Sequence, residues 1–222
     1  MKKLFIGCWI IIAFLVLPGC GPALFQVQVN GYTDPSAPAP LNPGATFFIM
    51  ENQEAKNPLL EKEINLKIAR LLTAQGFQIT TFEKAAYYLL FSYGLGPAQN
   101  VSVTVSDYYP FGWGFAPETA NRLSYPYFFA VPYWASYSFA ETIYDRWLLI
   151  NVVDGKTYRD HRKFLTLWVG EARSTGASAD LRVAMNYLLT ATFAQWGKNT
   201  GKAVPVNLTM EDIRVKELEK LP

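Results

Sequence analysis

The order of strand-like and helix-like patterns constrains this chain more than any other feature of its sequence. Short apolar or alternating runs typical of β-strands are separated by two longer stretches with the spacing of amphipathic helices. Strands and helices do not alternate regularly enough for a doubly wound parallel fold. The pattern predicts an α+β fold, in which an antiparallel β-sheet carries two main helices packed on one face. The predicted strands cover residues 25–30, 46–50, 87–93, 101–105, 147–153 and 164–172.

Local end signals define both predicted helices. The first begins with Asn57 as its cap and Pro58 in the first helical position, where the missing N–H of proline costs nothing. Gly76 ends this helix as a left-handed terminal residue. The second helix opens at Asp180 and ends at Gly197. The apolar stripes that we expect to face the core are Leu60, Ile64, Ile68, Leu71 and Leu72, then Leu181, Met185, Leu188, Leu189, Thr192 and Trp196.

The N-terminus has the features of a bacterial lipoprotein signal. Lys2 and Lys3 are followed by an apolar run over residues 4–17, and then by Gly19 and Cys20. The lysines stay on the cytoplasmic side, the apolar run enters the translocon, and the thiol of Cys20 accepts a diacylglyceryl group before cleavage. As a helix the run spans roughly 21 Å, short of the ~30 Å hydrocarbon core, which disfavours a permanent membrane span. We expect Cys20 to carry diacylglyceryl and N-acyl chains such as palmitate, which suffice for stable anchoring.

An ordinary secretory signal is the alternative. Pro18 stands where a lipoprotein signal usually carries Ala, Ser, Thr, Val or Ile, and cleavage after Ala23 would leave Gly21 and Ala23 at the two small-residue positions. In enterobacterial systems an Asp after the acylated Cys retains a lipoprotein in the inner membrane. Gly21 therefore favours the outer membrane, facing the periplasm.

Removal of the signal changes the charge and the thiol content. The full chain has 20 Lys and Arg against 18 Asp and Glu; without Lys2 and Lys3 the two counts are equal. No basic excess remains that would favour nucleic acid. Of the two cysteines, Cys8 is discarded with the signal and Cys20 is acylated, so no thiol is left for a disulfide or a metal site.

The chain divides into four predicted segments. Residues 1–19 form the signal peptide. Residues 20–44 contain five prolines and form a tether, interrupted by the strand predicted at 25–30. Residues 45–200 form a single α+β domain with an aromatic-rich insertion at 107–138, and residues 201–222 form a tail with a short charged helix.

The insertion is the strongest candidate for a functional surface. Twelve aromatic residues lie between Tyr108 and Tyr137, together with four prolines that argue against a long central strand or helix. The rings could pack back onto the sheet, form an exposed platform for a glycan or a partner protein, or enter a membrane interface. We favour a partner or glycan contact. The candidate contact residues are Trp113, Tyr125, Tyr133 and Trp134.

Signals for catalysis are weak, and we predict that the chain is not an enzyme and uses no cofactor. His161 is the only histidine and lies in a charged stretch over 159–163, where a solvated loop histidine is favoured over a catalytic one. With no free Cys and no closely spaced Asp pair, no metal site is expected. Carboxylates for glycoside cleavage could come from Glu118, Glu141 or Asp145 near the aromatic segment, which is the enzyme alternative.

Two short sequence motifs in the chain suggest a family. The first helix ends in Leu72-Thr73-Ala74-Gln75-Gly76-Phe77, and the last predicted strand contains Trp168-Val169-Gly170-Glu171-Ala172. Over roughly residues 25–200 the sequence resembles bacterial lipoproteins that carry domain of unknown function 4136. The resemblance implies a location and a fold but no activity. We therefore expect a membrane-anchored envelope protein that acts as a binding or assembly module, with an envelope protein or peptidoglycan as its partner; a glycan-binding or glycan-cleaving protein is the alternative.

Overall fold

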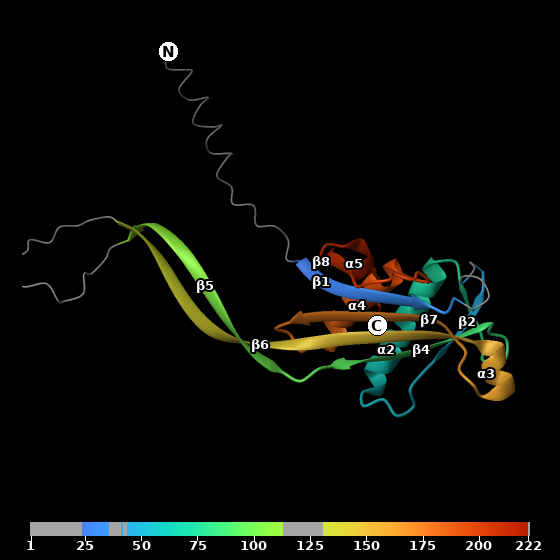
Figure 1. Ribbon diagram of the computed structural model, residues 1–222. Helices are drawn as coiled ribbons and strands as arrows, with labels where there is room; N and C mark the ends of the chain where they lie inside the picture. Colours follow the sequence, from blue (N-terminus) through green and yellow to red (C-terminus); the bar gives the residue numbers. More distant parts are fainter. Residues whose placement is uncertain (1–23, 36–40, 42–43, 113–130, 222) are drawn as a thin grey trace, which may run out of the picture.

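The computed structural model describes residues 24–35, 41, 44–112 and 131–221. Eight strands and four helices make up the fold of these residues (Figure 1). The strands are β1 (Leu24–Thr33), β2 (Thr46–Met50), β3 (Gln78–Ile79), β4 (Tyr87–Leu95), β5 (Gln99–Gly112), β6 (Val131–Asp154), β7 (Thr166–Gly176) and β8 (Val204–Thr209). The helices are α2 (Pro58–Ala74), α3 (Gly155–His161), α4 (Leu181–Ala194) and α5 (Ile213–Glu219).

One mixed sheet forms the body, with strand order β3-β2-β4-β6-β7-β1-β8. Its neighbours pair antiparallel, except that β2 pairs in parallel with both β3 and β4. The parallel pair arises because α2 carries the chain from β2 over one face of the sheet before β4 begins. The predicted α+β class is thus confirmed, and β2 is the strand that departs from an antiparallel arrangement.

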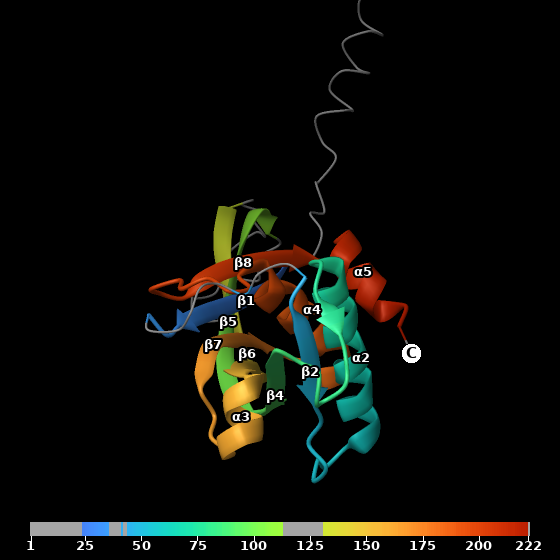
Figure 2. The same cartoon turned by 90° about the vertical axis from the view of Figure 1, so that its right-hand side faces the viewer.

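Helices α2 and α4 cover one face of the sheet, as predicted (Figure 2). Their apolar stripes meet the side chains that alternate strand positions direct to that face. The buried set includes Ile64, Ile68 and Leu72 of α2, Met185, Leu188 and Leu189 of α4, and Val27, Val29, Phe47, Ile49, Leu89, Leu148, Ile150, Val152, Trp168 and Ala172 of the sheet. Among the described residues, no helix is both long enough and apolar enough to cross a membrane.

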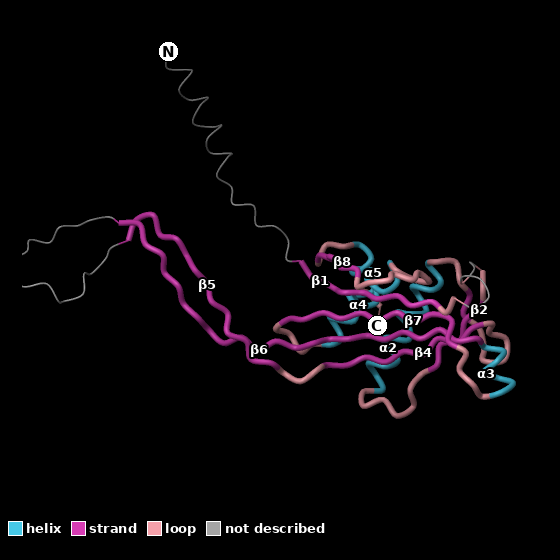
Figure 3. Tube along the Cα trace, in the orientation of Figure 1, coloured by secondary structure: helices cyan, strands magenta, loops and turns pink. Residues whose placement is uncertain are grey.

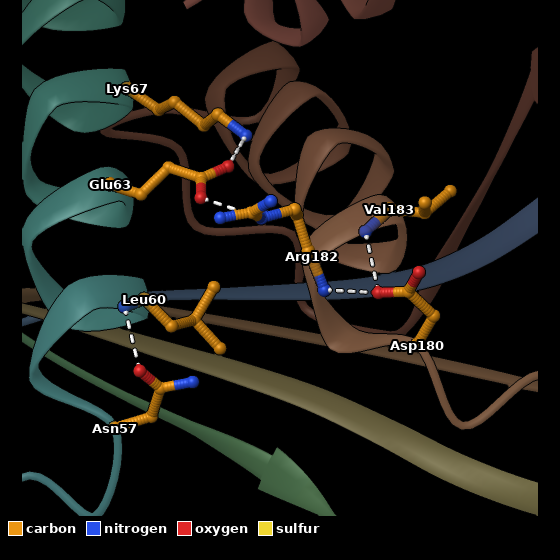
Figure 4. Close-up of polar contacts among 7 residues, drawn as sticks. All are labelled: Asn57, Leu60, Glu63, Lys67, Asp180, Arg182 and Val183. Atoms are coloured by element: carbon orange, nitrogen blue, oxygen red, sulfur yellow. Dashed lines mark hydrogen bonds and ion pairs between the residues drawn. The ribbon is translucent and has the colours of Figure 1, made fainter. Parts of the chain in front are cut away.

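The predicted caps are present at both helices. The Asn57 side chain accepts the N–H of Leu60, and the carboxylate of Asp180 accepts the N–H groups of Arg182 and Val183 (Figure 4). Gly76 and Gly197 take the positive φ angles expected of terminal glycines, 87° and 69°.

An ionic cluster joins the two helices, with Glu63 and Lys67 buried and Arg182 68% exposed. Lys67, 2% exposed, donates to Glu63 Oε1 at 2.7 Å, and Arg182 Nε of α4 lies 2.8 Å from Glu63 Oε2 (Figure 4). Because each carboxylate oxygen of Glu63 has a cationic partner, the cost of burying the charges is offset by short charge-assisted bonds.

A smaller apolar cluster lies apart from this core, under α3. It consists of Ala85, Tyr88 and Val153, and Tyr158 of α3 packs against it. The connection between β6 and β7 therefore contains a helix and is not a tight turn. The Asp154 carboxylate accepts the N–H of Thr157 at 2.6 Å, so this residue caps the helix.

The first strand corrects the predicted domain boundary. β1 pairs with β7 on one side and β8 on the other, so residues 24–33 belong to the sheet and do not form a tether. The prolines of the predicted tether at 35–43 lie after this strand. The tail assigned to 201–222 also contributes to the sheet, through β8, in addition to the predicted helix at its end. Neither pairing has a local signal, since both depend on strands far away in the sequence.

Trp168 of β7 lies at the centre of the larger core and is 1% exposed. Its indole N–H donates to the carbonyl of Lys198 at 3.1 Å, beyond the end of α4. Gly170 leaves room for the ring, because a Cβ atom there would overlap the Trp168 ring and lie 2.8 Å from the Thr192 methyl. Gly31 stands opposite Gly170, and a Cβ at Gly31 would overlap the Lys198 carbonyl oxygen.

Replacement of Gly170 tests this packing. We expect Gly170→Ala to lower the free energy of unfolding by roughly 1–3 kcal/mol, because the added methyl must displace the indole ring or Thr192. Thr175→Ala, at an exposed position of the same strand, should change it by less than about 0.5 kcal/mol. Denaturant unfolding measures both values; an equally stable Gly170→Ala variant would contradict the packing described.

Candidate functional site

The most prominent surface feature is a two-stranded ribbon formed by β5 and the first half of β6. It projects from the body at the end where β1 begins (Figures 1 and 3). β6 joins the body sheet only from Tyr144 onward, and residues 131–143 pair with β5 alone. In the described part of the chain, the outer edges of this ribbon have no strand beside them.

One face of the ribbon carries hydroxyl groups. The Oγ1 atom of Thr104 lies 2.7 Å from Oγ of Ser138, and Ser106 and Ser136 are hydrogen-bonded in the same way at 2.9 Å. Closer to the body, Thr142 donates to the side-chain oxygen of Asn100. These cross-strand pairs hold the register of the two strands.

The other face is apolar and exposed. Val103 stands opposite Phe139, and Val105 stands opposite Tyr137. The Phe139 and Tyr137 side chains are 45% and 53% exposed, and their rings are stacked with centroids 6.4 Å apart. A ribbon of two strands has no second layer to cover such a face, so these rings are available to a partner.

A buried guanidinium lies where the ribbon meets the body. Arg146 is 5% exposed, and its charged group lies over the Phe25 ring, 4.7 Å from the centroid. Tyr187 of α4 stacks on the same ring, with centroids 4.1 Å apart. Burial lowers the pKa of Arg146, and no described carboxylate forms an ion pair with it. Sequence reasoning missed this residue, which has no local signal.

Three exposed apolar side chains lie at the same end of the body. Leu24 is 67% exposed and pairs with Thr209 at the end of β8, immediately before Met210. Met210 and Ile213, the first residue of α5, are each 64% exposed. We call Leu24, Met210 and Ile213 the end patch; it lies where the chain enters the sheet from its N-terminus.

The predicted aromatic contact residues divide into two groups. Trp113 and Tyr125 lie outside the described residues, as does Cys20. Tyr133 and Trp134 lie in β6, where they stand opposite Tyr109 and Tyr108 of β5; the structure describes their backbone only. The prolines were expected to exclude a long central strand, and the structure agrees for Pro110 of β5 and Pro132 of β6, which lie in the two-stranded ribbon and not in the centre of a sheet. Proline is tolerated because each ribbon strand has an unpaired edge, where the missing N–H breaks no ladder.

The candidates for catalysis are not assembled into a site. His161 is exposed at the last residue of α3. Glu141 and Asp145 are four residues apart in β6, so their Cα atoms lie about 13 Å apart along the strand, whereas glycosidases hold their two carboxylates roughly 5–9.5 Å apart. Glu118 lies outside the described residues. Among the residues that the structure describes, no cluster of three or more His, Cys, Asp or Glu is placed to hold a metal ion.

Comparison with known proteins identifies the family. The model of DUF4136, a domain of unknown function, matches residues 31–196. The chain belongs to this family. The resemblance that the Gly76-Phe77 and Trp168–Ala172 motifs suggested is thereby confirmed.

Solved structures with related architecture include three bacterial proteins. A PDZ domain protein from Parabacteroides distasonis is 16% identical with a TM-score of 0.47; the match covers 90% of this chain and 42% of that protein, so the chain spans less than half of its length. A DUF4136 family protein from Bacteroides thetaiotaomicron is 19% identical (TM-score 0.41, 76% and 95% covered). The PelC dodecamer from Paraburkholderia phytofirmans is 11% identical (TM-score 0.41, 77% and 98% covered). No curated protein matches the chain.

The exposed ribbon should be the least protected part of the sheet. We expect the amides of residues 101–106 and 136–140 to exchange hydrogen much faster than those of residues 148–152, which lie between two strands in the body. Hydrogen exchange followed by mass spectrometry on the purified protein measures the difference. Equal protection of the amides in the ribbon and in the body would contradict the exposed position of the ribbon.

Proposed function

We propose that this DUF4136 protein is a lipid-anchored component of the bacterial cell envelope that binds or assembles other envelope components through its β5–β6 ribbon. It acts by binding and not by catalysis, and its site of action is the periplasmic side of the outer membrane. The observation that carries the proposal is the ribbon itself, with one apolar face whose Tyr137 and Phe139 rings are about half exposed.

The position of β1 supports the lipid anchor. Leu24, where β1 begins, is only four positions after Cys20, a length of chain that spans at most about 14 Å. Acylation of Cys20 would therefore hold this end of the body close to the bilayer. The end patch formed by Leu24, Met210 and Ile213 lies there, and contact with the lipid surface would remove its apolar side chains from water.

The same geometry restricts where the ribbon acts. The ribbon leaves the body at the end that carries the start of β1 (Figure 1). An anchor at Cys20 would then place the ribbon near the membrane surface and not far out in the periplasm. Its partner is accordingly a component at that surface, such as a membrane-associated protein or a further copy of this chain.

Replacement of the anchoring residue tests the location. We expect Cys20→Ser to move the protein from the membrane fraction to the soluble fraction of the envelope, because no thiol remains to accept the lipid. Sucrose-gradient fractionation of cells that produce either form measures the change, and Cys8→Ser is the matched control that should remain in the outer membrane. A serine variant that stays membrane-bound would show that the lipid on Cys20 is not the anchor.

Photo-crosslinking distinguishes the two ribbon faces. A photoreactive phenylalanine at Val103, on the apolar face, should crosslink in living cells to a defined neighbour; the same residue at Thr104, on the hydroxyl face, should not. The paired replacement Tyr137→Ser with Phe139→Ser should abolish the crosslink from position 103, whereas Ser136→Ala with Ser138→Ala should preserve it. Trp113→Ala with Trp134→Ala extends the test to the aromatic part of the segment.

Two results would contradict the proposal. Equal crosslinking from positions 103 and 104 would mean that the apolar face makes no specific contact. An unchanged crosslink after both aromatic replacements, with the fold intact by circular dichroism, would show that the rings contribute nothing to the interaction.

A further inference from the structure

The second half of β4 forms an open sheet edge. β2 pairs with β4 only as far as Leu90, where the partner residue is Met50. From Phe91 to Leu95, β4 pairs with β6 on its other side, and no described strand occupies the β2 side. Five consecutive residues of this strand therefore have a free edge.

The chain after β2 is held away from that edge. The N–H of Asn52 donates to the carboxylate of Glu61 in the first turns of α2, at 2.9 Å, and the side chain of Asn65 donates to Glu51 at 2.8 Å. Both bonds tie the residues after β2 to the helix instead of the sheet. Glu61 is 4% exposed, so the acceptor of the first bond is fixed inside the fold, while Asn52 and the second bond lie at the surface.

A cleft of about 890 Å³ lies along the open edge. All five residues from Phe91 to Leu95 line it, together with residues 52 and 54–57 and the first turns of α2 and α4. Figure 4 shows these two first turns side by side, with Leu60 directed into the space between them and Arg182 reaching across to Glu63. The Phe91 and Tyr93 rings, stacked with centroids 6.2 Å apart, form an apolar surface on the helix side of the strand.

Alternate residues of β4 direct their backbone N–H and C=O groups to the open edge. Gly96 donates its N–H to the carbonyl of Asp145 in β6, at 2.7 Å. Because donors and acceptors alternate along antiparallel strands, the even-numbered residues of β4 face β6. The N–H and C=O groups of Phe91, Tyr93 and Leu95 then face the open edge, with the spacing that an added strand requires.

The electrostatics of the cleft favour a particular sequence. Glu54, Glu61 and Asp180 line it against two cations, Lys56 and Arg182. Three carboxylates against two cations leave the cleft lining with an excess of one negative charge. Burial, followed by the nearby Glu61 carboxylate, raises the pKa of Tyr93 to about 12 and keeps its hydroxyl protonated as a donor.

We propose that this cleft binds an extended peptide segment of a partner protein, which adds as a strand to the β4 edge in the place where β2 would continue. Main-chain bonds to Phe91, Tyr93 and Leu95 supply the affinity. Apolar side chains of the peptide, at alternate positions, face the Phe91–Tyr93 surface and Leu60. Basic side chains are preferred over acidic ones because of the carboxylate excess. The site is distinct from the ribbon and does not depend on the lipid anchor.

A displayed library of random seven-residue peptides tests the proposal. The purified full-length protein is the target, and a Leu95→Pro variant, which removes one edge N–H without touching the β6 pairing, is the counter-selection target. We expect enriched peptides with alternating apolar residues and a surplus of Lys or Arg. Leu95→Thr, which retains the N–H, is the matched control and should bind the same peptides. Failure to enrich any peptide over the Leu95→Pro variant would overturn the proposal.

Two measurements on the unmodified protein avoid any doubt about the folding of a variant. A synthetic copy of the most enriched peptide, N-methylated at alternate residues so that it cannot pair as a strand, should bind on the order of tenfold to a hundredfold more weakly. Binding of the unmethylated peptide should slow hydrogen exchange at Phe91, Tyr93 and Leu95 and leave the ribbon unaffected. Equal affinity of both peptides, or protection only at the ribbon, would refute strand addition at β4.

Discussion

The packing of Trp168 over Gly170 is the interaction on which the rest of the core depends. The indole ring lies on the helix-covered face of β7 and donates to the Lys198 carbonyl after α4. Trp196 packs against it with centroids 4.8 Å apart, and the Trp196 ring in turn contacts Phe47 of β2, Phe77 after α2 and Phe193 of α4. One aromatic cluster thus joins the two sheet halves to the ends of both helices. The ring of Trp168 requires glycine at 170, and the Lys198 carbonyl that accepts its N–H requires glycine at 31, because a Cβ atom at either position would overlap these groups.

This packing explains the two sequence motifs that suggested the family. In Trp168-Val169-Gly170-Glu171-Ala172, the first, third and fifth residues face the core, and the glycine makes room for the tryptophan. In the motif that ends α2, Phe77 donates its N–H to the Leu72 carbonyl, and Gly76 takes a φ of 87°. This arrangement ends the helix with the Leu72 and Phe77 side chains both buried. The residues of both motifs stabilise the core of the fold. For this reason they identify the family and the fold but carry no information about a ligand.

What the sequence could predict follows the range of the interactions involved. Helices α2 and α4 were predicted with their ends because Asn57, Gly76 and Asp180 act on residues only a few positions away. The edges of the sheet were not predictable in this way. β8 was missed, and the strand predicted at 25–30 was placed within a tether and not in the sheet, because the sheet positions of β1 and β8 come from pairing with each other and, for β1, with β7, some 140 residues further along the chain. The ribbon was recognised as an aromatic segment, but its two faces appear only once Val103 is paired with Phe139. The β4 cleft had no sequence signal, since it exists where β2 stops.

Exposed strand edges invite uncontrolled association, and the ribbon and the open segment of β4 differ in how this is limited. The outer part of the ribbon carries Pro110 in β5 and Pro132 in β6, each of which removes an N–H from the strand in which it lies. Strand addition is thereby hindered at the outer part of the ribbon, which leaves its apolar face as the surface suited to contact. The open segment of β4 contains no proline, and its residues line the cleft between the sheet edge and the first turns of α2 and α4. A recessed edge with intact N–H donors is poorly accessible to another sheet and well suited to a peptide. The ribbon is therefore suited to contact through its apolar face, and the open segment of β4 to contact through its strand edge.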